Sequence, residues 1–148
     1  MAAPEIASCN DIKNLINANS PFTTLAVVAS RKYCFPTKAN QIPEDSALAY
    51  VYPVSKEINQ AAARRRSEDI VTIYITILRR LDKTTDITEV DETLTLADDI
   101  KELLQRKELS NGTVQSVGQP RVFNPKHIEE ESFVESTIEV TANVYRVA

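Results

Sequence analysis

The segment RRRSEDIVTIYITILRRL, residues 64–81, decides the fold class. From Val71 to Ile77 every odd position is a valine or an isoleucine, and every even position is a threonine or a tyrosine. This period of two predicts a β-strand with one buried face. Arginines stand at both ends of that strand: Arg64, Arg65 and Arg66 before it, and Arg79 and Arg80 after it. A nucleic-acid groove, a phosphate site and a protein–protein contact all use such a pattern, so the rest of the chain has to distinguish among them.

Regular patterns on either side predict further elements. Residues 131–147 alternate between apolar and polar positions and are typical of a long antiparallel strand with one wet face. Helical spacing of apolar residues predicts a helix at 89–107 and a shorter one at 8–16. The other segments are predicted as a strand at 23–35 covered on both faces, a loop at 36–45, a strand at 47–54, a protruding inter-strand loop at 55–67, a short strand at 113–117 and a loop at 120–125.

Several single residues refine the predicted boundaries. Ser8 followed by Asp11 is typical of a capping box, so the first helix is expected to open there. Pro53 predicts an edge position or the end of its strand, because proline cannot donate to a ladder. Asn111 and Gly112 are expected to end the second helical region and turn the chain.

The order of these elements predicts an α+β fold. Strands outnumber helices and are not separated by regular crossovers, which favours a mainly antiparallel β-sheet with two helices packed on one face. At 148 residues the chain is expected to form one domain, residues 1–148, with the loop at about 55–67 protruding from it.

Composition argues against most enzymatic classes. Two glycines cannot build a Gly-rich phosphate loop, and two cysteines with one histidine cannot build a four-ligand Cys/His zinc site. His127 is the one side chain with an ordinary pKa near neutrality, but its neighbours show no nucleophile motif, so we interpret it as a surface residue. Cys9 and Cys34 are expected to be free thiols. We therefore expect no catalytic, cofactor or metal site.

Charge and hydropathy constrain the partners. A net charge of −4 and a pI near 5.1 argue against a general nucleic-acid binder, although a local basic patch remains compatible. The N-terminus lacks the pattern of a secretory signal, and no apolar run approaches the ~18 residues of a membrane helix. We expect no membrane association and a cytoplasmic site of synthesis.

The charged residues suggest how copies of the chain meet. Three consecutive arginines cannot point in one direction from a regular element, which suits a loop that reaches a diffuse acidic surface or a loop that only solubilises. Acidic side chains gather on the second helix and the last strand. If these basic and acidic surfaces lie apart, one copy's basic side can meet the next copy's acidic side, and such a contact closes into a ring when the rotation permits. The candidate contact residues are Arg64, Arg65, Arg66, Arg79, Arg80, Asp98, Asp99, Glu102, Glu135 and Glu139.

Three segments resemble a known family. After the N-terminal helix come ALAYVYPVSKEINQAAARRRSEDIVTIYITILRR (47–80), ETLTLADDIKELLQ (92–105) and FVESTIEVTANVYRV (133–147). Their order as strand, charged excursion, strand, helix and closing strand resembles the tail terminator, or tail-completion, proteins of long-tailed bacteriophages, the group that contains the minor tail protein U of phage lambda. The resemblance covers nearly the whole chain and consists of pattern rather than a signature motif.

The resemblance implies a structural role in a virion. It implies a homo-hexameric ring, assembled in the host cytoplasm, that ends the tail tube and joins it to the head-completion or connector protein, with genome DNA passing through its channel. It also implies no enzymatic activity and no cofactor. The alternatives are another head–tail connector or neck ring protein, and a small nucleic-acid-binding module that uses the loop carrying Arg64 to Arg66. An enzyme with His127 as its base is a third.

Overall fold

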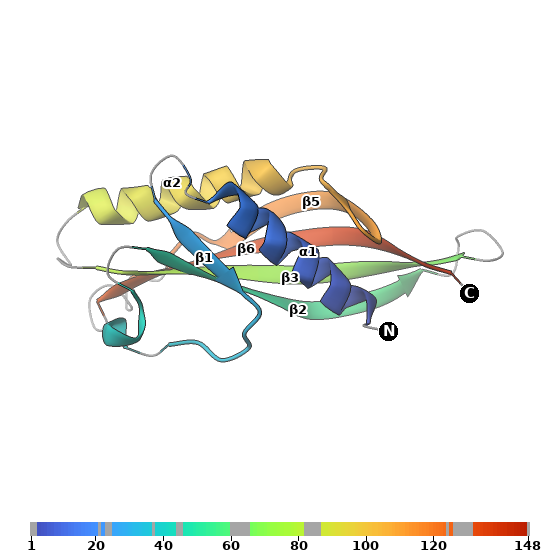
Figure 1. The fold of residues 1–148 in the computed structure, drawn as a ribbon, viewed down its shortest axis with the longest axis horizontal. Coiled ribbons are helices and arrows are strands. Elements are labelled where there is room, and N and C mark those ends of the chain that lie inside the picture. Colours follow the sequence, from blue (N-terminus) through green and yellow to red (C-terminus); the bar gives the residue numbers. More distant parts are fainter. Residues whose placement is uncertain are drawn as a thin grey trace.

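The computed structural model describes residues 3–20, 22, 25–36, 38–43, 46–59, 66–81, 87–123, 125 and 132–147. The elements in chain order are α1 (Pro4–Asn19), β1 (Val27–Ser30), a 3₁₀ turn η1 (Ala39–Gln41), β2 (Ala47–Asn59), β3 (Arg66–Arg80), α2 (Ile87–Leu104), β4 (Glu108–Leu109), β5 (Gly112–Arg121) and β6 (Phe133–Val147). Figure 1 shows their arrangement.

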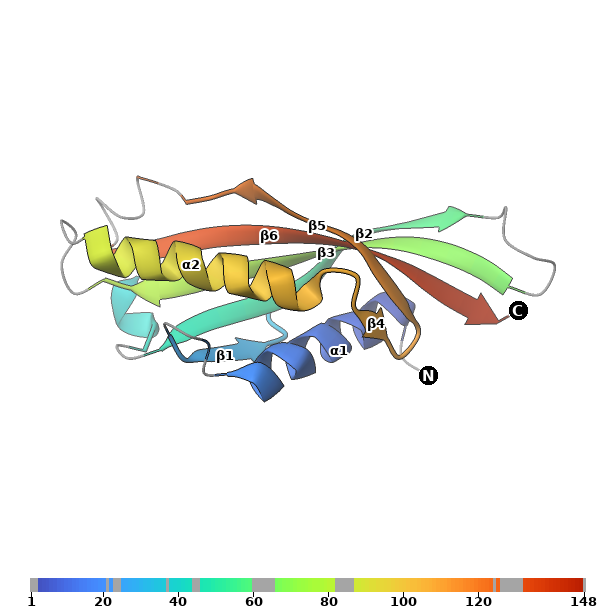
Figure 2. The same ribbon diagram turned by 90° about the horizontal axis from the view of Figure 1, so that it is seen from above.

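The described strands form one six-stranded sheet in the order β1-β2-β3-β6-β5-β4. Its neighbouring strands are antiparallel except for β1 and β2, which are parallel. Both helices lie on the same face of this sheet, α1 over β1 and β2 and α2 over β6 and β5 (Figures 1 and 2). The predicted α+β fold, a mainly antiparallel sheet with two helices on one face, is therefore confirmed.

Strands β3 and β6 form the centre of the sheet. They pair along their whole length, from Arg66 opposite Val147 to Arg80 opposite Phe133. The odd-numbered apolar residues of β3 from Val71 to Ile77 are fully buried under the helices, as their alternation predicts. The one-faced pattern predicted for the last strand is confirmed in the same way, because its even-numbered apolar residues from Val134 to Val144 are fully buried.

The helices contribute the other half of the core. Ile12 and Ile16 of α1, and Leu96, Ile100 and Leu104 of α2, have no exposed surface. Their spacing places each set on one side of its helix, so each helix buries one stripe against the sheet. The predicted helix at 89–107 is thus confirmed in its type and its buried face.

The helix starts and turns differ from the sequence prediction. α1 begins at Pro4, a residue suited to the first turn because its missing N–H would be unpaired there anyway. The predicted capping box is therefore wrong. Ser8 is buried inside the helix and donates to Asn111 Oδ1 at 3.1 Å, while Asp11 accepts from the backbone N–H and hydroxyl of Ser110.

The segment after α2 also differs from expectation. The helix ends at Leu104, and Arg106 adopts a positive φ of 55°. Asn111 and Gly112 turn the chain between β4 and β5 instead of ending the helix. The Asn111 side chain donates to the carbonyl of Pro4 at 3.1 Å, so this turn is fastened to the first residue of α1.

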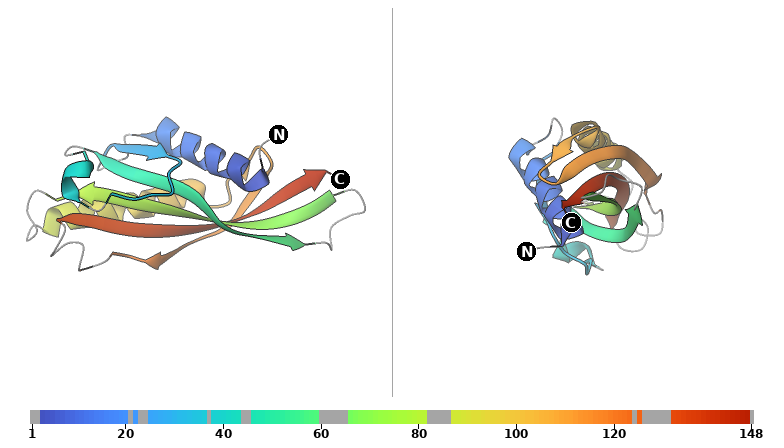
Figure 3. Two further views of the ribbon diagram at one scale, coloured as in Figure 1. Left: turned by 90° about the horizontal axis from the view of Figure 1, so that it is seen from below. Right: turned by 90° about the vertical axis from the view of Figure 1, so that its right-hand side faces the viewer.

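The loop predicted at 55–67 is shortened from both sides. β2 continues to Asn59 and β3 begins at Arg66, while residues 60–65 lie outside the described part of the chain. Paired strands extend here because Ser55 to Asn59 find partners in β3, a long-range contact that overrides their polar composition. β2, β3 and β6 thus run beyond the helical layer, as Figures 1 and 3 show.

Three other strands differ in extent or position. The strand predicted at 23–35 shrinks to Val27–Ser30, and only one face is covered because Val28 is exposed. Pro53 lies inside β2 at a register shift, beyond the part that β1 covers, so the edge prediction is confirmed and the strand-end prediction is wrong. The strand predicted at 113–117 extends to Arg121, which takes Pro120 out of the predicted loop.

Candidate assembly surfaces

The arginines of the opening segment do not form one patch. Arg66 is the first residue of β3 and Arg80 is the last, so at ~3.3 Å per residue the two clusters are about 45 Å apart. Arg64 and Arg65 lie outside the described residues, as does the side chain of Arg66. The two ends of the strand therefore belong to two different surfaces of the molecule.

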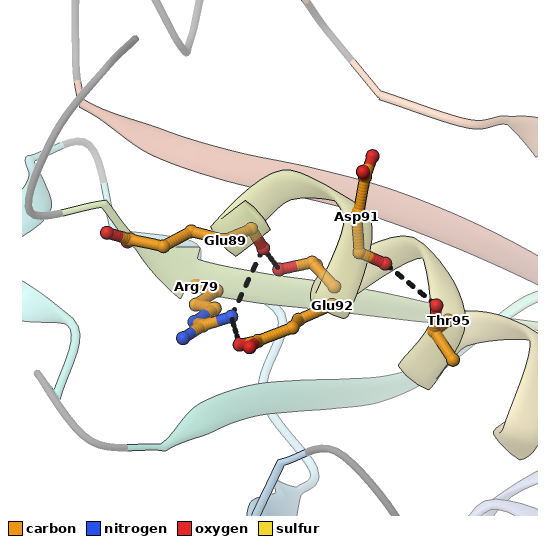
Figure 4. A network of polar contacts seen from close by, with 6 residues as sticks. Arg79, Glu89, Asp91, Glu92 and Thr95 are labelled. Carbon is orange, nitrogen blue, oxygen red and sulfur yellow. Dashed lines mark hydrogen bonds and ion pairs between the residues drawn. The ribbon is translucent and has the colours of Figure 1, made fainter. Parts of the chain in front are cut away.

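Arg79 binds within the chain. Its Nη1 donates to Glu92 Oε2 at 2.7 Å and to the carbonyl oxygen of Glu89 at 3.1 Å (Figure 4). This half-buried ion pair joins the end of β3 to the beginning of α2. Arg80 next to it is half-buried opposite Phe133. The intermolecular role of both arginines stays a prediction, while the intramolecular role of Arg79 is seen directly.

The acidic candidates are divided between the two faces of the sheet. Asp98 and Glu102 are exposed on α2 and Asp99 is half-buried there. Glu135 and Glu139 are half-buried on β6 and lie on the helix-free face, in register with Leu78 and Tyr74 of β3. Asp98 and Glu102 are neighbours one helical turn apart, whereas Glu135 and Glu139 share a face of β6 but lie about 13 Å apart along the strand. The structure does not bring the two groups together. Whether these residues contact another copy stays a prediction.

An aromatic cluster covers part of the helix-free face. Phe35 stacks on Tyr50 with ring centroids 5.7 Å apart and packs at a tilt on Tyr52 at 5.3 Å. Tyr52 meets Tyr74 edge to face at 6.0 Å, and its hydroxyl lies 3.1 Å from Thr76 Oγ1. Burial raises the pKa of Tyr50. These contacts hold the segment after β1 against the sheet.

Next to this cluster lies a shallow recess of about 280 Å³ on the same face. It is lined by Tyr52, Tyr74, Pro120, Glu135 and Thr137. In the part of the chain that the structure describes, no group of three or more His, Cys, Asp or Glu side chains has the arrangement of a metal site. His127 lies outside that part.

Two exposed apolar patches lie near opposite ends of the strand order, one beside β1 and one beside β5. The first, which we call the β1 patch, consists of Val28, Tyr33 and Phe35, with 53%, 59% and 38% of their surfaces exposed. The second, the β5 patch, consists of Val122 and Phe123, exposed by 47% and 38%, directly after β5. Figure 2 shows β1 and β5 on opposite sides of the molecule.

The exposed edge of β1 is closed by Asn17 of α1 and by Ser20, the residue that follows α1. The amide of Asn17 donates to the carbonyl of Ala29 at 3.0 Å and accepts from the N–H of Ala29 at 2.8 Å, as a neighbouring strand would. The hydroxyl of Ser20 accepts from the N–H of Val27 at 3.0 Å. An incoming strand would have to displace these bonds.

The remaining edges carry features that discourage strand addition. Beyond β1, the outer side of β2 presents Pro53, a register shift and Lys56, which forms an ion pair with Glu5 of α1 at 3.3 Å. β5 has two register shifts, after Val114 and after Gly118, and contains Pro120. Bulges, prolines and charged side chains are the usual means by which proteins prevent edge-to-edge pairing.

Sequence reasoning missed the residues that form these surfaces. The local sequence around Asn17 gives no sign that its amide completes the edge of β1. The two patches were missed because their position depends on which strands lie at the sides of the sheet.

The two cysteines are free, with Cys9 buried in α1 and Cys34 exposed between Tyr33 and Phe35. Neither described helix is long and apolar enough to cross a membrane.

Comparison with known proteins identifies a similar fold. No protein-family model matches the sequence, and no curated protein matches it. A chain in a solved structure of the virion of a native gene transfer agent particle matches with a TM-score of 0.57 and 13% sequence identity. The match covers 99% of this chain and 100% of that chain. At this identity the likeness concerns the fold alone.

Proposed function

We propose that this chain is a structural subunit of a phage-like virion, and that copies of it form a ring that ends the tail tube and joins it to a head-side connector. The observation that carries the proposal is the end-to-end likeness of its fold to a chain of a gene transfer agent virion. The order of elements in the sequence, which resembles tail terminator proteins, supports the same role independently.

The surfaces are compatible with assembly rather than chemistry. Within the described residues, the conspicuous features are two exposed apolar patches and acidic groups on both faces of the sheet, and ionisable groups do not converge in a deep pocket. A subunit of a ring needs two different contact surfaces, because a heterologous contact joins unlike patches. The β1 and β5 patches satisfy this requirement.

Negative-stain imaging of the purified protein tests the proposal. We expect closed rings, six-fold by the family resemblance, with a central hole. When isolated tail tubes of the same virion are added, rings should decorate one end of each tube. A protein that remains monomeric at every concentration, or one that binds along the sides of tubes, would contradict the proposed role.

A DNA-binding measurement separates the proposal from the nucleic-acid alternative. The acidic chain is expected to let DNA pass through the ring without retaining it, so binding should be weak at physiological salt. Tight, steeply salt-dependent binding of duplex DNA by the monomer would instead favour a nucleic-acid-binding module.

A further inference from the structure

We propose that, within the ring, the β1 patch of one copy packs against the β5 patch of the next copy. This inference rests on the proposed function and adds which surfaces of the subunit meet. In this contact each patch is covered by side chains of another copy of the same chain.

The first argument is that both patches lie at the same level along the strands. Val28 is in register with Leu48, Leu48 with Leu78, and Leu78 with Glu135. On the far side of β6, Arg121 pairs with Thr137, and Val122 and Phe123 follow directly after it. The patches therefore lie at opposite ends of nearly the same row of the sheet, with Val28 and Phe35 on its helix-free face. Copies related by a rotation can bring them together without a shift along the strands.

The second argument is chemical complementarity. Both patches are apolar and aromatic, the composition found in the centres of protein interfaces. Beside the β1 patch stand the exposed cations Lys32 and Lys38. α2, which packs on β6 and β5, carries the exposed acids Asp91, Asp98 and Glu102, of which Asp98 also pairs with Lys101 at 3.4 Å. A contact of β1 patch with β5 patch places opposite charges around an apolar centre, whereas a contact of like patches places like charges together.

The third argument is that the edges themselves are closed. Asn17 and Ser20 occupy the outer edge of β1, and β5 is interrupted by register shifts and Pro120. Neighbouring copies consequently cannot extend the sheet by simple strand addition at these positions. The exposed side chains beside the edges remain as the contact surface.

A cysteine cross-link tests the contact with the chain's own reporter thiol. Cys34 is exposed inside the β1 patch, and Cys9 is fully buried and stays silent. In the variant Val122→Cys, oxidation with diamide should join Cys34 of one copy to position 122 of the next, because a disulfide needs Cα atoms within about 7 Å. We expect a ladder of covalent oligomers on a denaturing gel, which disappears when Cys34→Ala is added.

The matched control is Tyr145→Cys, at a residue 48% exposed near the other end of β6. It should yield no ladder beyond what wild type gives. A ladder from Tyr145→Cys that equals or exceeds the one from Val122→Cys would overturn the inference.

A second variant tests the contact by its effect on self-association, without a cross-linking reaction. Val122→Asp should weaken self-association at least tenfold in sedimentation velocity, whereas Val54→Asp, at an equally exposed valine, should leave it unchanged. Rings that form normally from Val122→Asp and give no ladder with Val122→Cys would refute this contact and leave the proposed function standing. Wild-type protein that never associates would refute both.

Discussion

At Gly112 the backbone leaves no room for a side chain. A Cβ atom built there would lie 1.9 Å from the carbonyl oxygen of Asn143, a backbone atom of β6 that cannot turn aside. Gly112 faces Val144 in the ladder and begins β5, so its strand would have to move away from β6. The close approach of two backbones is what requires glycine at this position.

We predict that Gly112→Ala lowers the free energy of unfolding by about 3 kcal/mol, at the upper end of the usual cost of overpacking. Urea unfolding monitored by circular dichroism measures the change. Gly118→Ala is the control, since a Cβ there meets no atom within 4 Å, and its effect should be small. Equal effects of the two substitutions would show that steric exclusion is not the cause.

Cys9 predicts a dependence of stability on pH. Burial raises the pKa of its thiol to about 12, from 9.0, with Arg31 opposing the change and Glu5 adding to it. Above about pH 9 the unfolded chain loses this proton while the folded chain keeps it. The thiol therefore favours the unfolded state increasingly, by about 1.4 kcal/mol per pH unit, until the folded pKa is reached.

Cys9→Ala should remove this dependence. Between pH 8 and about pH 10.5, the stability of wild type is expected to fall by about 2 kcal/mol more than that of Cys9→Ala. Tyr50 ionises in both proteins and cancels in the comparison. Urea titrations at the two pH values measure the difference, with Cys34→Ala as the control for losing a thiol. A pH-independent gap between wild type and Cys9→Ala would contradict the prediction.

The edge strand β1 depends on its neighbour α1. Four residues paired on one side make a weak strand, and the amide of Asn17 supplies the bonds that a second neighbouring strand would otherwise give. An edge closed in this manner cannot template the addition of another chain. The Asn17 side chain therefore contributes both to the stability of the monomer and to its resistance to aggregation.

Asn17→Ala should lower the free energy of unfolding by about 2 kcal/mol, because it leaves two backbone groups of Ala29 without their partner. It should also speed hydrogen exchange of the Ala29 amide. Asn19→Ala is the matched control, since Asn19 bonds only to the carbonyl of Leu15 in its own helix. An Ala29 amide that stays equally protected would argue against the closing role of Asn17.

Elements with strong periodicity were predictable, and their ends were not. Alternation identified the buried faces of β3 and β6, because a period of two has one structural interpretation over such a length. The polar end of β2 was predicted as loop because its strand geometry comes from pairing with β3, which the local sequence does not encode. Likewise, Ser8 has the residue type of a cap, but Pro4 begins the helix a turn earlier.

The candidate surfaces were less predictable than the fold. Charged candidates were identified by residue type, yet one of them, Arg79, pairs within the chain with Glu92, which was not a candidate. The β1 and β5 patches emerge only from the strand order, in which β6 enters between β3 and β5. Strand order is a property of the whole chain, so inspection of single segments does not reveal which residues flank the sheet.

For the whole molecule we predict that self-association weakens with salt. Lys32 and Lys38 stand beside the β1 patch, and α2, which packs on β6 and β5, carries exposed acids, so screening should reduce the attraction between copies. We expect a dissociation constant about tenfold higher at ~0.5 M than at ~0.05 M NaCl, measured by sedimentation velocity. Lys32→Glu with Lys38→Glu should weaken association at low salt and abolish most of the salt effect. An association that strengthens with salt would indicate a purely apolar contact.

The pairing of β3 with β6 has a consequence for biosynthesis. Arg80 pairs with Phe133, 53 positions later in the chain, and the other pairs of these two strands are further apart in sequence. At the usual 5–20 residues per second, a ribosome needs roughly 3–11 s to make the segment between them. During that interval β3 has no β6 strand to pair with. The nascent chain is therefore expected to remain incompletely folded until β6 emerges, which makes this interval the period in which a chaperone would bind it.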